Sequence, residues 1–539
     1  MGYGRDMNIN EAHPNVQRTA AGGDVVHGTD IGIPVTVQGA DGTQRVFFFF
    51  GDTDPLDPDA WADGKIRKAD GDVWDPFVAR KGVIQGDALA FADDPDPDDG
   101  IQLTHLLRNE EAGGPKVCEV EDADGIRATF VPGLHDNEAF HFVPGVPGDP
   151  CIGGATILTP TGAFALGDTL WMVNAVQTSF ADPTQPDRSF LSVSTDGGVN
   201  WRLLNGGQPL SNSGSGPGGK FIHVSTVDVD GALYRNPATS GRCELPPPPG
   251  ASSQGKLLYG TGTWLWGGLY LGFVYDDDLR AAIDAPDQPL KIYYWAGPTA
   301  CWTQDQGQAV EVFEARQGRH YAQWEWPCGH RIVDTTGGLG YTSAIRIRGT
   351  ADGEDFDRIV LATNPKYFLC PDDGSDDVCC GGQPLDGEPG VCSFPPGEPT
   401  RDLRDMSLGI VLLTARTRQP WRFDTTDGDP ASPTALSPLP QPASVPFPGA
   451  GPACHAIAPP EGYLGGYAPL IVDRYTRPGS REGTFDLYVL SSVWEPDVYN
   501  VNAFRTTIEV FADAQTVNRR RSESGPHGAA PQGRRSGGR

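Results

Sequence analysis

Short runs of β-branched, aromatic and other apolar residues recur along the chain, and glycine, proline or aspartate turns separate them. The runs cover 25–37, 45–53, 155–176, 190–204, 220–234, 256–275, 291–297, 341–349, 358–365, 408–417, 464–475, 484–494 and 502–511. An apolar period of 3.6 residues is nowhere sustained beyond a turn or two, and the best helix candidate is the short segment 276–284. Many short strands at fairly regular spacing are typical of a propeller, a sandwich or a barrel, so we predict an all-β fold.

Composition supports this prediction and restricts the partners. The 539 residues include 70 glycines and 49 prolines, which helix interiors do not tolerate well. Lysine and arginine number 41 against 70 acidic residues, and the resulting net charge of −29 repels nucleic acids. The sequence contains no run near the ~18 apolar residues of a membrane-spanning helix. We therefore expect a soluble chain with no nucleic-acid partner and no membrane span.

One local motif selects among the three architectures. Residues Ser194 to Trp201 read STDGGVNW and match the S-x-D-x-G-x-x-W pattern called the Asp box. In this hairpin the aspartate satisfies N–H groups of the turn, glycine takes a positive φ, and tryptophan packs the blade. The box recurs in β-propellers, where it lies away from the axis. We therefore predict a propeller in which Asp196 is structural and not catalytic.

Cysteine usage indicates an oxidising compartment. The ten cysteines are an even number in loop-like sequence, which favours disulfides over free thiols or metal ligation. They are Cys118, Cys151, Cys243, Cys301, Cys328, Cys370, Cys379, Cys380, Cys392 and Cys454. The crowded segment from Cys370 to Cys392 has neither CxxC spacing nor a histidine, so we predict local bridges there. Residues 1–10 show no secretory signal, and an extracellular or cell-surface location therefore rests on the cysteines alone.

The chain divides by composition into one domain with two extensions. Residues 1–21 form an N-terminal extension and 22–514 the propeller, with loop insertions at about 232–255, 370–402 and 424–460 that are rich in Pro, Gly, Ser and Asp. Residues 515–539 form a tail with Arg519, Arg520, Arg521, Arg534, Arg535 and Arg539 among Gly, Ser and Pro. A segment of this composition cannot bury a core, so we expect a disordered basic tail.

Two aspartates combine a strand setting with glycine neighbours. Asp30 lies in HGTDIGIP (27–34), and Asp52 follows the apolar run 46–50 in FGDT. A carboxylate at the end of a buried strand is costly unless it is paired or used in chemistry. The alternative is structural, because Asp52 could simply cap a turn. Since glycoside hydrolysis needs two carboxyl groups across a cleft, the pair is our catalytic candidate.

Nine segments in order resemble a widespread bacterial family formerly of unknown function. They include HGTDIGIP, FFFFGDT, PTGAFALGDTLWM, LGGYAPLI and YVLSSVWEPDVYNVNAFRT, and the resemblance covers about 22–512. Some members of that family are endo-D-arabinofuranases, and the family fold is a five-bladed β-propeller with glycoside-hydrolase activity. The resemblance implies that Asp30 and Asp52, in the intact G-T-D and F-G-D-T motifs, are the catalytic acids.

Other positions are candidates for substrate binding. After Y-G-T, relatives carry an arginine where this chain has Trp264 and Trp266, which could stack on sugar rings or pack a blade. His330 stands where relatives present a polar strand to the funnel, although a structural histidine is the alternative. Asp87 could tune a neighbouring acid. His27 would face away from Asp30 on an ideal strand and shares the funnel only if Gly28 bends the chain.

Together these features indicate a monomeric glycoside hydrolase acting on a furanose-containing bacterial polysaccharide. The rival interpretation is a non-catalytic glycan-binding or adhesion propeller, which the missing arginine and long loops favour. A sialidase would show several Asp boxes and an arginine triad, whereas this sequence has one box. The acidic runs 52–59 and 93–100 do not fit an EF-hand, so we predict no cofactor. The axial channel of such a propeller could hold a structural cation, but no ligand set is assignable.

Overall fold

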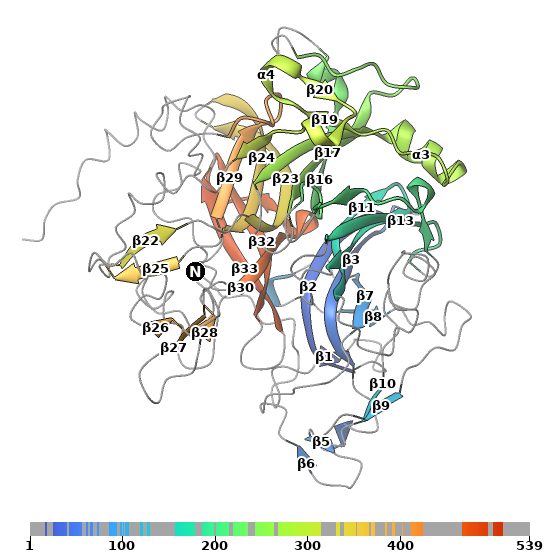
Figure 1. Ribbon diagram of the computed structural model, residues 1–539. Helices are drawn as coiled ribbons and strands as arrows, with labels where there is room; N and C mark the ends of the chain where they lie inside the picture. Colours follow the sequence, from blue (N-terminus) through green and yellow to red (C-terminus); the bar gives the residue numbers. More distant parts are fainter. Residues whose placement is uncertain are drawn as a thin grey trace, which may run out of the picture.

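The structure is a computed structural model of the chain. It describes residues 17–18, 25–39, 42–55, 61–62, 65–67, 73–74, 86–93, 97–99, 101, 103–106, 119–121, 127–129, 157–177, 186–198, 201–214, 219–235, 243–262, 268–313, 330–334, 339–351, 353–365, 368–371, 383–384, 391–393, 401–402, 411–423, 466–493 and 500–509. These residues form an antiparallel all-β fold in which five sheets follow one another around a common centre, as Figure 1 shows.

Each of the five sheets is a blade built from one continuous stretch of the chain. Blade 1 contains β1 (Gln17–Arg18), β2 (Val25–Gln38), β3 (Gln44–Pro55), β7 (Gly86–Ala92) and β8 (His105–Leu106). Blade 2 contains β11 (Ile157–Leu166), β12 (Thr169–Gln177), β13 (Arg188–Ser194), β14 (Arg202–Leu203) and β15 (Ser211–Asn212). Blade 3 contains β16 (His223–Asp230), β17 (Gln254–Thr261), β18 (Leu269–Tyr275), β19 (Tyr293–Trp295), β20 (Trp302–Thr303) and β21 (Glu311–Phe313).

The last two blades complete the ring. Blade 4 contains β23 (Leu339–Ala351), β24 (Glu354–Pro365) and β29 (Val411–Arg416). Blade 5 contains β30 (Gly466–Ile471), β31 (Arg477–Pro478), β32 (Thr484–Val493) and β33 (Asn500–Glu509). The inner strands β2, β11, β16, β23 and β30 each contact the next, and β30 contacts β2. The predicted five-bladed propeller is therefore confirmed, with the first and last blades as neighbours.

Small elements surround the blades. The described residues also form four minor sheets. Two of them have three strands each: β4 (Trp61–Ala62), β5 (Lys65–Arg67) and β6 (Val73–Trp74) in one, and β26 (Gln383–Pro384), β27 (Val391–Ser393) and β28 (Arg401–Asp402) in the other. The other two have two strands each: β9 (Glu119–Glu121) with β10 (Arg127–Thr129), and β22 (His330–Asp334) with β25 (Phe368–Pro371). The helices are α3 (Asp276–Asp284), α4 (Gly297–Ala300), η1 (Pro97–Asp99), η4 (Asn205–Gly207), η5 (Gly231–Tyr234), η6 (Gln306–Gln308) and η9 (Asp473–Tyr475). The predicted helix 276–284 is confirmed as α3. The segment 370–402, predicted as a loop insertion, includes the short strands β26 to β28.

The core lies between the blades. On β2, Val35 and Val37 are buried while Pro34 and Thr36 are half-buried toward the axis, which is the period-2 pattern of an inner strand. On β3 the whole run from Val46 to Phe50 is buried, because neighbouring blades cover both faces of this strand. Separate apolar clusters fill the spaces between blades 2 and 3, 3 and 4, and 4 and 5, and one larger cluster joins blades 5, 1 and 2.

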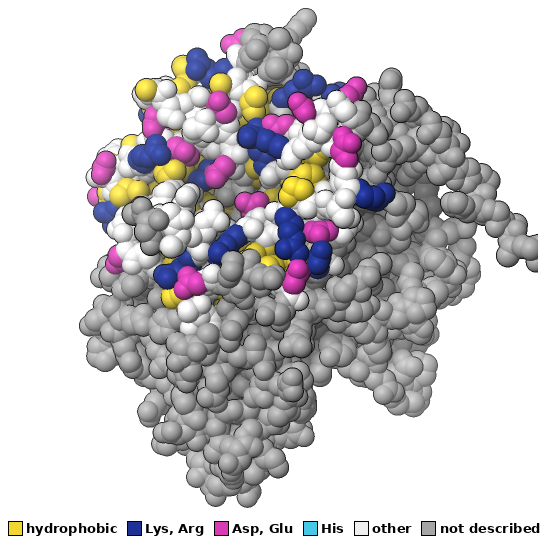
Figure 2. Space-filling model, turned by 180° about the vertical axis from the view of Figure 1, so that it is seen from behind, with side chains coloured by type: hydrophobic (Ala, Val, Ile, Leu, Met, Phe, Trp, Pro, Cys, Tyr) yellow, Lys and Arg dark blue, Asp and Glu magenta, His cyan; other side chains and the backbone are white. Residues whose placement is uncertain are grey.

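The surface that the structure describes carries charges of both signs. Figure 2 shows Lys and Arg side chains interspersed with Asp and Glu on the face seen from behind, with apolar groups between them. This mixture matches the many ion pairs of the described residues, such as Arg45 with Asp93 and Arg477 with Asp98. In the part of the chain that the structure describes, no helix is long and apolar enough to cross a membrane.

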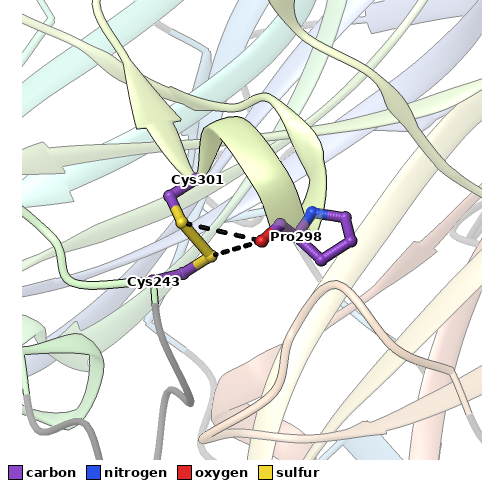
Figure 3. Close-up of a disulfide and its surroundings, with 3 residues drawn as sticks. All are labelled: Cys243, Pro298 and Cys301. Carbon is purple, nitrogen blue, oxygen red and sulfur yellow. Dashed lines mark hydrogen bonds between the residues drawn. A yellow bond between two sulfur atoms is a disulfide. The ribbon is translucent and has the colours of Figure 1, made fainter.

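One disulfide is present among the described residues. Cys243 bonds to Cys301, and the two Cα atoms are 4.9 Å apart. Figure 3 shows both sulfur atoms beside the carbonyl oxygen of Pro298, at 3.5 and 3.9 Å. The bridge ties the proline-rich segment 243–250 to the end of α4 and supports the prediction that cysteines pair. The side chains of Cys370 and Cys392, and all of Cys379 and Cys380, lie outside the described part, so the bridges predicted among these four cysteines stay a prediction.

Candidate functional site

A channel runs along the axis of the ring. It has a volume of about 200 Å³ and is lined by the five inner strands, together with Lys256 from β17 and Asp473 from η9. The first lining residue on each inner strand is Ile33, Thr161, Val224, Tyr341 or Leu470, and between one and eight residues of the strand precede it. The channel therefore begins inside the inner strands and extends toward the hairpins that follow.

The strands become irregular where the channel begins. Four of the five inner strands shift register against their neighbours immediately before or at the first lining residue, and the shifts fall between Ile31 and Ile33, Pro160 and Gly162, Leu339 and Thr342, and Tyr467 and Leu470. Such bulges bend a strand and redirect side chains, and they are common at barrel rims and beside active sites. We therefore locate the candidate site at the bulged end of the ring, which we call the funnel end.

Register places the two candidate acids side by side at the funnel end. Asp30 of β2 lies opposite Gly51 of β3, and Asp52 is the next residue along β3. The pairing shifts on both sides of Asp30, so this residue stands between two bulges. The structure describes the backbone of both aspartates, whereas their side chains lie outside the described part. The two residues that we predicted as a pair from the sequence therefore lie on adjacent strands of blade 1.

The third aspartate follows on the next strand of the same blade. On β7, Ala88 lies opposite Phe50 and Gly86 lies opposite Thr53, so Asp87 falls between them where the register shifts. Asp87 is therefore at the same end of blade 1 as the candidate pair. Its side chain is also outside the described part, and its role in tuning a neighbouring acid remains a prediction.

The remaining predicted residues are less closely placed. His27 stands where β2 shifts register between Val26 and Gly28, so the strand is not ideal at this point. His330 begins β22, opposite Pro371 of β25, in a minor sheet separate from the five blades. The side chains of both histidines, and all of Trp264 and Trp266, lie outside the described residues.

A sharp backbone kink follows Asp30 directly. Ile31 has φ of +65° and Gly32 has φ of +78°, two consecutive residues in the left-handed region. Glycine adopts this region freely, but for a β-branched residue such as isoleucine it is a genuine outlier. The Ile31 N–H does not go unsatisfied, because it donates a hydrogen bond of 2.6 Å to Ser492 Oγ on β32. Sequence reasoning missed this kink, for which the only local signal is Gly32.

A buried histidine lies at the corresponding level of blade 3. His223 immediately precedes the lining residue Val224, is 0% exposed, and has its ring edge-on to that of Tyr341 at 4.1 Å. Burial lowers the pKa of His223 to about 3, so the ring is neutral near pH 7. Among the described residues, neither ring nitrogen has a hydrogen-bond partner. Sequence reasoning did not single it out, although a histidine opening an apolar strand was a visible signal.

Lys256 and Arg346, at the opposite end of the channel, are each paired with an aspartate, and Asp473 of η9 also lines this end. Lys256 is 3% exposed and forms an ion pair with Asp228. Arg346 donates to Asp357, and although burial opposes it, the hydrogen bonds from Arg346 and Thr417 lower the pKa of that carboxyl group. These contacts join neighbouring strands, so we assign the two pairs a structural role.

The Asp box forms the predicted turn, in which the Ser194 hydroxyl bridges the Asp196 carboxylate and a turn N–H group. Ser194 Oγ donates to Asp196 Oδ1 at 2.8 Å and accepts from the Gly198 N–H at 2.9 Å. Gly197 and Gly198 have φ of +76° and +94°, and the buried Trp201 donates from Nε1 to the Gly198 carbonyl oxygen. This hairpin closes β13 and lies off the axis. Within the described ranges, no three His, Cys, Asp or Glu side chains gather as a metal site.

Comparison with known proteins gives only distant likenesses. No family model and no curated protein matches the sequence. Among solved structures, an exo-1,5-α-L-arabinanase from a bovine ruminal metagenomic library is 10% identical, with a TM-score of 0.34 and coverage of 90% of this chain and 94% of that one. A GH43 endo-arabinanase from Bacillus licheniformis is 8% identical, with a TM-score of 0.33 and coverage of 93% and 98%.

A sialidase is similar over a smaller part of its own length. A mutant of Trypanosoma rangeli sialidase with trans-sialidase activity is 8% identical, with a TM-score of 0.31 and coverage of 88% of this chain. This chain spans 44% of that sialidase. Likenesses at this level do not transfer an activity, so the case for function rests on the chain's own residues.

Proposed function

We propose that the chain is a glycoside hydrolase that cuts a furanose-containing bacterial glycan, in the manner of an endo-D-arabinofuranase. The observation that carries the proposal is the register of blade 1, in which Asp30 and Asp52 stand on adjacent strands at the funnel end. The resemblance of their two motifs to the arabinofuranase family supports the same pair. A monomeric protein at or outside the cell surface fits the cysteine usage and the Cys243–Cys301 bridge.

The proposed mechanism divides two roles between the two carboxyl groups. One must be neutral to protonate the leaving oxygen, while the other must be ionised to attack or to activate water. Neighbouring carboxyl groups do not readily ionise together, so their proximity separates the two pKa values. Asp87, on the third strand at the same end, adds a negative charge that would favour the protonated form of a nearby acid.

A second function has one specific observation in its favour. The segment after Y-G-T carries Trp264 and Trp266 in place of the arginine of relatives. Aromatic faces bind sugar rings without contributing chemistry, so a glycan-binding propeller without hydrolysis is the alternative.

The two functions separate in a cleavage assay. We expect the wild type to release reducing ends from D-arabinan, with other furanosides and pyranosides as controls. Asp30→Asn and Asp52→Asn should each lose about 10²- to 10⁴-fold in rate, because asparagine neither ionises nor delivers an acidic proton. Their melting temperatures should stay the same or rise, since removal of a desolvated charge relieves strain.

Asp196→Asn is the matched control, because it changes another aspartate beside left-handed glycines. Any activity that this variant loses should follow its loss of folded protein. Full activity in both Asp30→Asn and Asp52→Asn would overturn the catalytic pair. A wild type that binds D-arabinan and never cuts it would establish the glycan-binding alternative.

A further inference from the structure

The kink after Asp30 is unusual even among the strained positions of this chain. Among the described residues only four other than glycine have positive φ, namely Ile31, Asn205, Cys301 and Ala468. Asn205 and Cys301 lie in turns beside short helices, where such values are common. Ile31 and Ala468 instead lie inside the inner strands β2 and β30, and Ile31 is the β-branched member of the set. A glycine at this position would adopt the same φ without cost.

Blade 5 encloses the kink. Ile31 is 2% exposed and its N–H donates to Ser492 Oγ, which is itself 0% exposed. A Cβ on Gly32 would lie 3.0 Å from Phe50 Cε1 and 3.5 Å from Val501 Cγ1, so β3 and β33 confine the next residue. The hydrogen bond and the Val501 contact come from another blade, and together with Phe50 of blade 1 they hold a conformation that Ile31 would not adopt alone.

Strain of this kind persists only where surrounding structure over-determines it, and it concentrates at functional sites. The strained peptide is covalently joined to Asp30, which stands between the two bulges of β2. A change of the Ile31 φ angle therefore rotates the strand segment that carries Asp30 relative to Asp52 on β3. The alternative is that Ile31 merely fills the apolar layer between blades 1 and 5.

We infer that Ile31 and Ser492 are positioning residues that set the orientation of Asp30 toward Asp52. This inference rests on the proposed function, in which Asp30 is a catalytic acid. Ser492 acts through the backbone N–H of Ile31 and not by contact with substrate. The Ser492 hydrogen bond and the surrounding packing hold Ile31 in this geometry, whereas a glycine in its place would also populate other φ values.

The inference is tested by changing either the strained residue or its hydrogen-bond acceptor. Ile31→Gly relieves the strain but also leaves a cavity in the core, so we expect a lower melting temperature together with a loss of kcat per folded molecule of about 10- to 100-fold and little change in KM. Ser492→Ala removes the acceptor of the Ile31 N–H, and we expect a similar loss of kcat. Ser492→Thr keeps a hydroxyl group at the same position and should restore most of the activity.

Ser491→Ala is the matched control. Ser491 is equally buried and adjacent on β32, but successive side chains of a strand face opposite sides. We expect this variant to lower the melting temperature about as much as Ser492→Ala while kcat stays within about 2-fold of the wild type. Equal losses of kcat in the two alanine variants, or an Ile31→Gly variant with full kcat, would overturn the inference.

A readout without substrate separates this inference from the proposed function. Modification of Asp30 by a water-soluble carbodiimide, followed by mass spectrometry at several pH values, reports the titration of its carboxyl group. The midpoint should move in Ile31→Gly and Ser492→Ala but not in Ser491→Ala, whether or not arabinan is cut. An identical midpoint in all variants refutes the positioning role, whereas absent cleavage with a shifted midpoint refutes only the proposed activity.

Discussion

Two regions of the chain place an aspartate beside left-handed residues, and they are stabilised in opposite ways. In the Asp box, glycines supply the positive φ angles, and the hydrogen bonds join residues at most four positions apart. In the kink, an isoleucine takes the first left-handed position, and its hydrogen-bond partner is 461 positions away. The box is therefore a local structure that the sequence around it specifies. The kink costs about 1–3 kcal/mol of backbone strain and exists only in the assembled ring.

The largest effect should come from the tryptophan that anchors the box. Trp201 is 2% exposed and its ring lies 5.8 Å from that of Phe49, in the layer between blades 1 and 2. Trp201→Ala should lower the free energy of unfolding by about 3–5 kcal/mol, because it removes a large buried side chain and leaves a cavity. Urea unfolding measures this loss. If activity per folded molecule also falls, the box contributes to the site and the contrast between the two regions fails.

A pair of glycine variants compares the two regions directly. Gly197 and Gly32 have nearly the same φ, at +76° and +78°. A Cβ at Gly197 would meet nothing within 4 Å, whereas a Cβ at Gly32 would press against Phe50. Gly197→Ala should therefore cost only the backbone term of about 1–2 kcal/mol, and Gly32→Ala about 1–3 kcal/mol more from overpacking.

Thermal and urea unfolding of the two variants, measured side by side, give this difference. Equal losses of stability would mean that Phe50 yields to the added methyl group. The kink would then be no more tightly enclosed than the exposed hairpin.

Acid should lower the stability of the fold through His223 at the funnel end, whereas the Asp box contains no histidine. The folded-state pKa of His223 is lowered to about 3, against about 6.5 when unfolded. Between these values the unfolded chain binds the proton and the folded one does not, so stability is lost as pH falls below about 6.5. From pH 6.5 to 5 this group alone should cost roughly 2 kcal/mol.

We compare the pH dependence of the urea midpoint in the wild type and in His223→Gln. Carboxyl groups titrate in both proteins, so the difference between the two curves isolates the contribution of His223. Urea midpoints between pH 7 and 5 should fall more steeply in the wild type. Parallel curves for the two proteins would show that the imidazole is protonated in the folded state, with a partner or solvent within reach.

Sequence reasoning succeeded where the determinants are local. The turn of Asp196, its glycines and Trp201 all lie within eight residues, and the helix 276–284 is equally self-contained. It failed where the determinant is distant. Ile31 reads as an ordinary strand residue, because the Ser492 hydroxyl that holds it belongs to the last blade. The number of cysteines predicted disulfides, but pairing of Cys243 with Cys301 depends on how blade 3 folds and not on spacing.

The kink links the proposed site to the order in which the chain is made. Strands β2 and β3 leave the ribosome early, but Ser492 and Val501 are near the other end of the chain, and contacts across so long a loop form late. Blades 1 to 4 could therefore assemble while Ile31 still lacks its partner. Arrival of the fifth blade completes the ring and supplies Ser492, so under the proposed function a chain that still lacks this blade would be inactive.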